Sequence, residues 1–502
     1  MNTFMNGLKN ATNYTYTENG ALAHKSTTSK LYDMFALGGA YRNRSDEDTI
    51  VLFKNAYDEN SEYALKCLFY MRDREVGQGE RRFFRVCYRW LAQNHLEAAR
   101  RNIENVPFYG RWDDLYCLEG TKLESDAFAF MKKQLALDVE SKTPSLLAKW
   151  LKSCNTSSAE SRRLGDKTRK AFGMTHKQYR KTLSILRERI NVLERLMSAN
   201  KWDEIEFDKI PSRAGMIYKN AFARHDLERA KSEKDVKTYE EFAKDTTTKV
   251  NAKVLYPYEC VAEALKCRCS ALDDTVRLMT NKYWDNLPDF VKNANFNGIV
   301  VADTSGSMTG SSASAPINVA ISLALYCAER ASGPYAGHYI SFASRPQLIE
   351  TSGVDFVDKV RRIYDTNLID NTNLEAVFDL LLNTAKTNNC KQEDIPQNVV
   401  IISDMQIDAA RGGGWSYRNA STKSVATEMD IIRNKWAAAG YNFPKVVYWN
   451  VDARENTILD GNEGITYVSG MSPTIYEQVL TGKTGYSLMM DKLDSDRYAR
   501  VK

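Results

Sequence analysis

Two short apolar runs that each end on an aspartate constrain the fold of this chain more than any other feature. Residues 298–303 read GIVVAD, and residues 398–404 read NVVIISD. Short runs rich in β-branched residues indicate strands buried on both faces, as in a parallel sheet. A third run of this kind covers 445–451, and a further strand is expected at 337–342.

The segments around these strands have helical periodicity. The expected helices cover 316–330, 356–364, 374–387, 423–439 and 473–480. Strands that alternate with helices favour right-handed βαβ units. We therefore predict a doubly wound α/β domain over residues 296–502.

Asp303 and Asp404 would lie at the carboxyl ends of their strands, where open α/β sheets bind ligands. Asp303 opens a D-x-S-x-S motif with Ser305 and Ser307, and Thr372 precedes an expected helix. Hydroxyl and carboxylate oxygens suit Mg²⁺, which also keeps positions for water or for an outside carboxylate. We predict a Mg²⁺ site here, and Ca²⁺ or Mn²⁺ would accept the same ligands. The alternative is that Asp303 and Ser307 cap one helix and Thr372 caps another.

The region before this domain has a different pattern. After a polar N-terminal arm at residues 1–20, residues 21–295 read as helical from about residue 46 onward. Apolar residues recur there at three- and four-residue spacing, and glycines and prolines interrupt the pattern. Helices of about 12–20 residues with short turns are typical of a solenoid. No repeat of fixed length is present, so any repetition is structural.

The two regions also differ in charge. Residues 1–297 hold 50 Lys and Arg against 41 Asp and Glu, a balance of +9, whereas the remainder holds 19 against 23, a balance of −4. Residues 151–200 alone carry 12 basic and 4 acidic side chains. This asymmetry indicates a polyanionic partner for the helical region.

Two basic clusters are the candidates for contact with the phosphates of RNA. The first comprises Arg162, Arg163, Lys167, Arg169, Lys170, His176, Lys177, Tyr179, Arg180 and Lys181. The second comprises Arg72, Arg74, Arg81 and Arg82. His176 or Tyr179 could stack on a base. The alternative is that both clusters are solvated helix faces and that Tyr179 belongs to the core.

The Asp303, Thr372 and Asp404 elements resemble the metal-ion-dependent adhesion site (MIDAS) of von Willebrand A domains. By that resemblance, Ser305, Ser307 and Thr372 would coordinate the ion directly or through water. The two aspartates would accept hydrogen bonds from ligating waters or hydroxyls.

The layout as a whole resembles Ro-type RNA-binding proteins, in which a TROVE module of HEAT-like helices precedes a von Willebrand A domain. It also resembles an uncharacterised family of the same layout in phages, bacteria and plants. The stretches that carry this likeness are DREVGQGER at 73–81, YGRWDDL at 109–115, KQYRK at 177–181 and PSRA at 211–214. The resemblance implies a HEAT-like array that could close into a ring, and binding of small structured or single-stranded RNA.

Other classes of function find little support in the sequence. The chain has no phosphate-binding loop, zinc-protease or nucleophile-elbow motif, so we do not expect an enzyme. Cys267 and Cys269 have no matching second pair, which makes a zinc site there improbable. No apolar run is long enough to span a membrane, and the polar start lacks a signal core. With scattered cysteines, this favours a cytoplasmic protein.

Two functional hypotheses follow. The first is an intracellular RNA-binding scaffold with a Mg²⁺-dependent docking site in its C-terminal domain. The second is a protein-interaction module that captures an acidic side chain of a partner at the metal site and binds no RNA. A metal-dependent hydrolase would need a general base that the sequence does not offer.

Overall fold

The structure, a computed structural model, describes residues 13–17, 22–232, 236–267, 271–292, 296–342, 345–366, 373–407, 428–459, 465–480, 483 and 485–502. The chain folds into two compact units. The first unit comprises Met1–Cys67, Leu255–Cys269 and Tyr283–Ser495, and the second comprises Leu68–Val254, Ser270–Lys282 and Asp496–Lys502.

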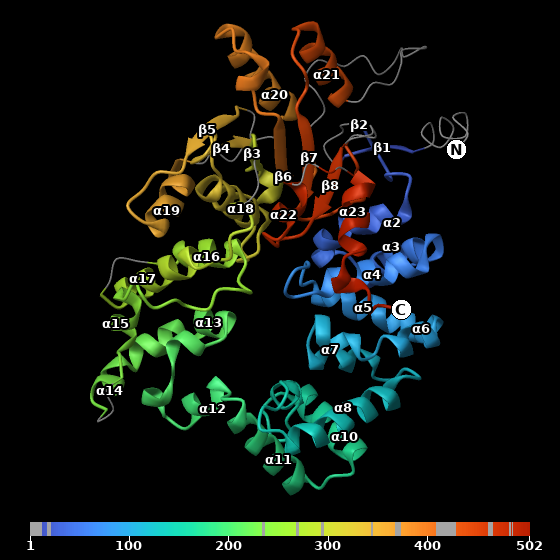
Figure 1. Ribbon diagram of the computed structural model, residues 1–502, viewed down its shortest axis with the longest axis vertical. Coiled ribbons are helices and arrows are strands. Elements are labelled where there is room, and N and C mark those ends of the chain that lie inside the picture. Colours follow the sequence, from blue (N-terminus) through green and yellow to red (C-terminus); the bar gives the residue numbers. More distant parts are fainter. Residues whose placement is uncertain are drawn as a thin grey trace. The chain divides into compact units, whose positions relative to one another are not determined.

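A six-stranded sheet forms the centre of the first unit (Figure 1). Its strands are β3 (Gly298–Asp303), β4 (His338–Phe342), β5 (Gln347–Glu350), β6 (Asn398–Ser403), β7 (Lys445–Asn450) and β8 (Thr466–Ser469). The spatial order is β5-β4-β3-β6-β7-β8, with β5 antiparallel to β4 and every other pair parallel. Numbered from β3, this is the 3-2-1-4-5-6 order of doubly wound folds.

The sheet is buried where the sequence is apolar. Every residue of β3 is buried, and β6 and β7 are buried after their first residue, as strands covered on both faces should be. The chain runs from β3 to β4 on one side and later returns to β6 on the other. The carboxyl ends of β3 and β6 therefore flank the point at which the strand order reverses, the usual ligand position in such sheets.

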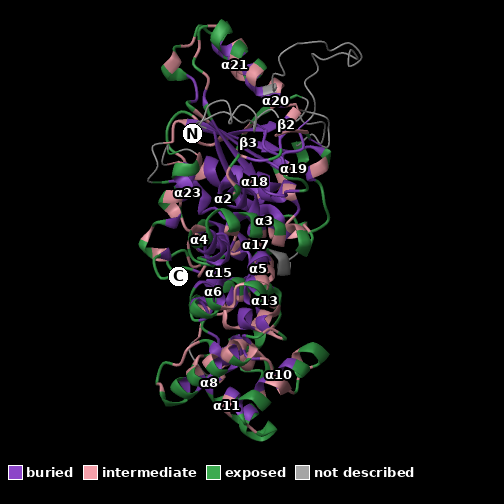
Figure 2. Cartoon of the chain, turned by 90° about the vertical axis from the view of Figure 1, so that its right-hand side faces the viewer, coloured by how far each residue is buried: buried purple, intermediate pink, exposed green. Residues whose placement is uncertain are grey.

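Helices surround the sheet of the first unit. They are α18 (Pro316–Arg330), α19 (Phe356–Thr366), α20 (Leu374–Thr387), α21 (Glu428–Ala438), α22 (Ile475–Val479) and α23 (Gly485–Leu493), with short 3₁₀ turns η5 (Gly306–Met308) and η6 (Gln392–Asp394). Helix α18 packs against β3, β4 and β6, and most of its residues are buried (Figure 2).

The start of the chain belongs to this same unit. Its elements are β1 (Tyr14–Tyr16), β2 (Leu22–His24), α2 (Lys30–Leu37), η1 (Gly38–Asn43), α3 (Asp46–Glu59) and the beginning of α4 (Ser61–Arg72). The Tyr32 hydroxyl accepts a hydrogen bond from the Tyr467 amide at 2.8 Å, and Ser469 Oγ accepts one from the Gly39 amide at 2.9 Å. A Cβ on Gly39 would lie 2.5 Å from the Ser469 carbonyl oxygen, so only glycine allows this approach to β8.

The second unit is helical in the part of the chain described. Its elements are α5 (Arg81–Asn94), α6 (Leu96–Arg101), α7 (Asn105–Tyr109), η2 (Trp112–Leu118), α8 (Glu124–Glu140), α9 (Leu147–Trp150), α10 (Ala159–Phe172), α11 (His176–Arg189), α12 (Leu193–Ser198), η3 (Trp202–Glu204), η4 (Phe207–Lys209), α13 (Ser212–Arg224), α14 (Asp226–Ala230) and α15 (Tyr239–Lys244). Helix α16 (Pro257–Ala264) lies in the first unit, and α17 (Ala271–Asp285) contributes to both.

The last residues of the chain belong to the helical unit. Tyr498, in the 3₁₀ turn η7 (Asp496–Tyr498), is buried and stacks on Tyr109 with ring centroids 5.6 Å apart. The carbonyl of Arg500 accepts a hydrogen bond from the Asn105 amide group at 3.1 Å. The sequence predicts one boundary between two domains, at residue 295. The compact units do not follow that boundary, because both ends of the chain pack against segments that are distant in sequence.

The expected helical region and the α/β sheet are both present, and the expected elements of the sheet lie within a few residues of the observed ones. Strands β5 and β8 were not expected, since each is only four residues long. Residues 14–16 of the expected polar arm form β1, which pairs with β2. None of the described helices has the length and the apolar character needed to span a bilayer.

Candidate functional site

Asp303 is the last residue of β3 and is fully buried. Its Oδ1 accepts a hydrogen bond from the Ser305 amide at 2.9 Å, and its Oδ2 accepts one from Ser403 Oγ at 2.5 Å. Ser403 ends the neighbouring strand β6. The Ser305 and Ser307 hydroxyls lie 3.1 Å apart. The D-x-S-x-S motif therefore curls over the carboxyl end of β3, as the sequence predicts.

Asp404 follows β6 and is also buried. Its Oδ1 accepts a hydrogen bond from the Gln406 amide at 3.1 Å, whereas its Oδ2 has no hydrogen-bond partner among the described residues. The Arg454 guanidinium is 3.8 Å from this Oδ2 and donates to the Ser307 carbonyl. Met405, which directly follows Asp404, has a φ of 63°. Residues other than glycine rarely adopt this left-handed backbone conformation.

The two carboxylates disfavour each other's charge. Burial and, to a smaller extent, the negative charge of Asp404 raise the pKa of Asp303 to about 7, against the hydrogen bonds from Ser403 and Ser305. Burial likewise raises the pKa of Asp404. Two buried acids at one edge of a sheet are costly unless a cation neutralises them.

The residues present fit a divalent cation on the chemistry of their donors. Asp303, Ser305, Ser307 and Asp404 supply hard oxygens, and Asp404 Oδ2 is a buried acceptor without a hydrogen-bond donor in the described chain. Thr372, the fifth residue of the predicted site, lies outside the described residues.

The alternative interpretation was that these residues only cap the helices that follow them, and the observed helix starts do not support it. Helix α18 begins after Ala315, with no side-chain cap, so neither Asp303 nor Ser307 caps it. Helix α20 is capped by Asn373, whose side chain accepts from the Ala376 amide at 2.9 Å.

A separate site lies within the helical unit, where a groove of about 1350 Å³ is lined by residues from Arg74 to Val254. Its basic lining residues are Arg74, Arg111, Lys149, Lys177, Arg180, Lys181, Arg187, Arg195, Lys209 and Arg213, against the acidic residues Glu194, Glu204 and Glu206. We call it the basic groove. Ten basic residues against three acidic ones create a positive potential suited to an anion.

Arg111 is part of the groove lining. Burial and, to a smaller extent, the nearby charges of Arg72 and Arg81 lower the pKa of Arg111 to about 10. Its guanidinium lies 4.5 Å from the centre of the Trp150 ring, which also lines the basic groove. An anion in the groove would favour the charged form of Arg111.

Five residues of the predicted RNA-binding set line the basic groove: Arg74, Lys177, Tyr179, Arg180 and Lys181. Four of them are exposed basic side chains. Tyr179 is fully buried, and its hydroxyl donates to the Lys152 carbonyl at 2.9 Å. The Tyr179 ring is therefore part of the core in this structure, and stacking on a base is not open to it.

The rest of the set lies outside the lining of the groove. Arg163 pairs with Glu119 and Glu160, with its Nη2 2.7 Å from Glu119 Oε2, and Lys167 pairs with Glu119 and Glu124. Arg163 and Lys167 are therefore neutralised by acidic side chains of the same unit.

Arg162 and Arg169 donate to backbone carbonyls at the two ends of α10, and Lys170 is exposed on the same helix. His176 lies 3.4 Å from Asp166. Near the start of the unit, Arg81 lies 4.0 Å from Asp113 and Arg82 is half-buried.

Arg72 is the clearest correction within this set. It is buried, and its Nη2 lies 2.7 Å from Asp114 Oδ2, while Arg85 pairs with the same carboxylate. An arginine held this way stabilises the turn around Asp114 and is closed to phosphate. The charge of Arg72 in the sequence cluster thus serves to neutralise a buried acid of the same unit.

Sequence reasoning missed Lys149, Trp150, Lys209 and Arg213 as groove residues. The Lys149-Trp150 pair was a usable signal, since a basic residue beside an aromatic one is typical of single-stranded nucleic-acid sites. Lys209 and Arg213 are brought to the groove only by the packing of η4 and α13.

The comparisons with known proteins divide the chain near the start of β3. A family model described as "Domain of unknown function (DUF2828)" matches residues 17–116 and 133–295, more than half of the chain. A second, "Domain of unknown function (DUF7788)", matches residues 297–496. The chain is 30% identical over 510 aligned residues to "Uncharacterized protein L728" of Acanthamoeba polyphaga mimivirus, covering 94% of this chain and 85% of the viral protein. The chain therefore belongs to the DUF2828 family, and its residues 297–496 are similar to the DUF7788 domain.

Proposed function

We propose that this chain is an RNA-binding scaffold of the Ro type, in which the basic groove of the helical unit holds RNA. The observation that carries the proposal is the lining of that groove, with ten basic residues against three acidic ones around a volume of about 1350 Å³. Phosphates would contact the exposed Arg180, Lys181 and Arg213, since counterion release from such contacts supplies most of the affinity for a polyanion.

Apolar groups in the groove support single-stranded segments as the ligand. Trp150 is half-buried, and Ile217 and Leu146 are exposed side chains of the lining. Unpaired bases stack on such surfaces, whereas the paired bases of an RNA duplex are withdrawn into its stack. Small structured RNAs would then bind through their loops and single-stranded ends.

The sheet of the first unit supports a von Willebrand A-type assignment for residues 296–502. The 3-2-1-4-5-6 strand order places Asp303 and Asp404 at the reversal of the sheet, each directly after or at the end of a buried strand. In this proposal Asp303, Ser305, Ser307 and Asp404 hold Mg²⁺ directly or through water. The ion would supply a positive charge with an open position for a carboxylate of a partner protein.

RNA binding is tested with two triple variants that remove the same charge. In the first, Arg180, Lys181 and Arg213 of the groove are replaced by Ala. In the second, the control, Arg162, Arg163 and Lys170 of α10 are replaced by Ala; all three lie outside the groove lining. Binding of a labelled single-stranded RNA and of a small hairpin is measured by fluorescence anisotropy across a salt series.

The proposal expects the groove variant to lose at least about tenfold in affinity and the α10 variant to lose much less. The slope of log K against log salt should fall by about 0.7 for each phosphate contact removed. Equal losses in the two variants would place RNA elsewhere. Absence of salt-sensitive binding by the unmodified chain would reject the proposal.

A second candidate function, metal-dependent capture of an acidic partner without RNA, rests on the buried Asp404 Oδ2 that lacks a hydrogen-bond donor among the described residues. It expects partners that are recovered with Mg²⁺, lost with EDTA, and lost from an Asp303→Ala chain. Recovery of the same partners under all three conditions would rule it out.

A further inference from the structure

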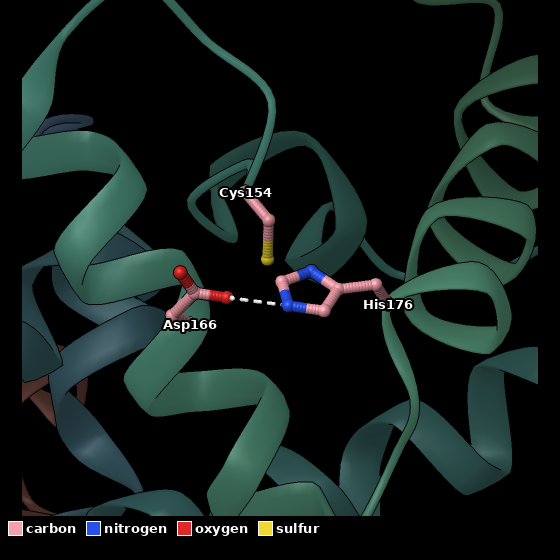
Figure 3. Close-up of side chains that lie close together, drawn as sticks. All are labelled: Cys154, Asp166 and His176. Carbon is pink, nitrogen blue, oxygen red and sulfur yellow. Dashed lines mark ion pairs between the residues drawn. The ribbon is translucent and has the colours of Figure 1, made fainter.

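Cys154, Asp166 and His176 form a cluster of metal-ligating side chains within the helical unit (Figure 3). Their ligand atoms, one from each residue, all lie within 4.8 Å of one another. Cys154 is a free thiol in the turn between α9 and α10, Asp166 lies on α10, and His176 is the first residue of α11. The proposed RNA-binding function does not depend on this cluster.

Close packing of backbone on backbone brings Cys154 to Asp166. A Cβ on Gly165 would lie 2.8 Å from the carbonyl carbon of Ser153 and 2.9 Å from the carbonyl oxygen of Lys152. Only glycine permits α10 to approach the turn this closely. Asp166 follows Gly165 and Cys154 follows Ser153, so this contact places Asp166 beside Cys154.

Helix α11 holds the same turn from another direction. Arg187 donates from Nη1 to Ser153 Oγ at 3.0 Å and from Nη2 to the Leu151 carbonyl at 2.9 Å. The Tyr179 hydroxyl donates to the Lys152 carbonyl at 2.9 Å. The backbone that carries Cys154 is therefore fixed by two helices, and ligand groups held in this way lose little freedom on binding an ion.

His176 and Asp166 are oriented by their own neighbours. Thr175 caps α11, and the Gln178 side chain accepts a hydrogen bond from the Thr175 amide at 2.9 Å, which fixes the first turn that carries His176. Arg169 Nε donates to Asp166 Oδ1 at 3.4 Å, and Arg169 Nη1 donates to the Met174 carbonyl at 2.8 Å. Carboxylates that bind metal are commonly hydrogen-bonded by such an outer partner.

We propose that Cys154, Asp166 and His176 bind Zn²⁺ or a similar thiophilic divalent cation. A thiolate and an imidazole select zinc over magnesium, because Mg²⁺ prefers oxygen ligands alone. Ligand atoms around tetrahedral zinc are roughly 3–4 Å apart, so the cluster must tighten by about 1–2 Å at most. The side chains of His176 and Asp166, which are 59% and 40% exposed, can make that adjustment.

Three protein ligands leave the fourth position of a tetrahedral site to water. The exposure of His176 and Asp166 gives the ion a path of entry from solvent. Cys154 also lines the basic groove. A bound ion would therefore cross-link α10, α11 and the turn at the edge of this groove. The proposal does not rest on RNA binding, since the three ligands would bind zinc whatever occupies the groove.

The test is a Co²⁺ and Zn²⁺ titration of the full chain after reduction and removal of metal. Excess Mg²⁺ is kept present so that the Asp303 site does not compete. Co²⁺ bound by a thiolate gives a sulfur-to-cobalt charge-transfer band, which oxygen ligands do not give. The variants are Cys154→Ser and His176→Ala, and the control is Cys390→Ser, which removes a half-buried thiol of the other unit.

We expect one equivalent of Co²⁺ with the charge-transfer band in the unmodified chain and in Cys390→Ser, and no such band in Cys154→Ser. His176→Ala removes an exposed side chain, so the chain should fold as before and bind Zn²⁺ at least about tenfold more weakly. Zinc should raise the Tm of the unmodified chain and not that of Cys154→Ser. Absence of the band, or its persistence in Cys154→Ser, would overturn the proposal.

Discussion

Arg497 and Asp73 form a two-point ion pair across 424 residues of sequence. Arg497 Nε donates to Asp73 Oδ2 at 2.8 Å, and Arg497 Nη2 donates to Asp73 Oδ1 at 2.9 Å. Asp73 is fully buried, and the Tyr498 hydroxyl donates to it as well at 3.2 Å. The end of the chain is thus part of the helical unit, although the α/β sheet separates it from that unit in sequence.

Replacing Arg497 by Ala should destabilise the helical unit, because the buried Asp73 carboxylate would lose its charged partner. Breaking a pair of this kind costs about 3 kcal/mol or more. Denaturant unfolding should show the loss, and replacement of the exposed Arg101 in the same unit should leave the midpoint nearly unchanged. Because the two residues share one interaction, the effects of Arg497→Ala and Asp73→Asn should not add. Additive effects would contradict the pairing.

The stability of the metal-free chain should fall as pH rises from about 4 to about 7. The pKa of Asp303 is raised from its ordinary value of 3.8 to about 7 by burial and by Asp404, so the folded chain retains a proton that the unfolded chain releases in this window. Stability contributed by the neutral acid is therefore present at low pH and lost as pH rises. Thermal unfolding in EDTA at a series of pH values measures it.

Saturating Mg²⁺ should oppose that loss, since the ion binds the ionised form and its stabilising effect grows with pH. An Asp303→Asn chain serves as the control, because it has nearly the same shape and lacks the carboxylate at position 303. Its Tm should respond less to pH in this window than that of the unmodified chain, and little to Mg²⁺. A Mg²⁺ response of Asp303→Asn equal to that of the unmodified chain would place the ion elsewhere.

Trp150, and not Tyr179, should be the aromatic residue that contacts RNA. Trp150 is half-buried in the lining of the basic groove, whereas Tyr179 lies fully in the core. Trp150→Ala should weaken single-stranded RNA binding by about 1–3 kcal/mol, the usual worth of one stacked base. Tyr179→Phe should leave RNA affinity unchanged and cost about 1 kcal/mol of stability through the lost hydrogen bond to Lys152. The opposite ranking of the two variants in anisotropy would disprove this assignment.

Gly165→Ala should destabilise the helical unit even though alanine favours helices. Its Cβ would lie under 3 Å from backbone atoms of Lys152 and Ser153, which side-chain rotation cannot relieve. Overpacking of this kind costs about 1–3 kcal/mol and outweighs the gain of up to about 1 kcal/mol in helix propensity. Urea unfolding checks the change, with Lys170→Ala on the exposed side of the same helix as the reference. A stabilised Gly165→Ala chain would contradict this close packing of α10 on the turn.

Local pattern was enough to predict the strands that carry Asp303 and Asp404. An unbroken run of β-branched residues has one stable environment, a strand covered on both faces, and its end then marks the edge of the sheet. The position of the D-x-S-x-S motif was predictable for a related reason, since its Asp and Ser side chains are two residues apart and share one turn. Strands β5 and β8 escaped prediction because four residues carry too little periodicity to separate a strand from a loop.

The sequence shows how many charged residues the helical region has, but not which of them lie together in the folded protein. The Arg162–Lys181 segment is basic, yet Arg163 and Lys167 are used by Glu119, a partner more than 40 residues earlier in the chain. The basic groove gathers Lys149, Lys209 and Arg213 from separate elements, and Lys209 there pairs with Glu206. Which cations remain for an anion depends on which acids pack beside them, and only the fold sets that.

The sequence alone thus determined the class of each region, the strand ends at Asp303 and Asp404, and the excess of positive charge before the sheet. These follow from interactions between residues close in sequence, or from simple composition. Tertiary structure decided that Tyr179 is buried, that Arg497 pairs with Asp73, and that Cys154, Asp166 and His176 meet. Each of those depends on backbone segments packing at a distance along the chain, as Gly165 does against Ser153, and no local pattern encodes that approach.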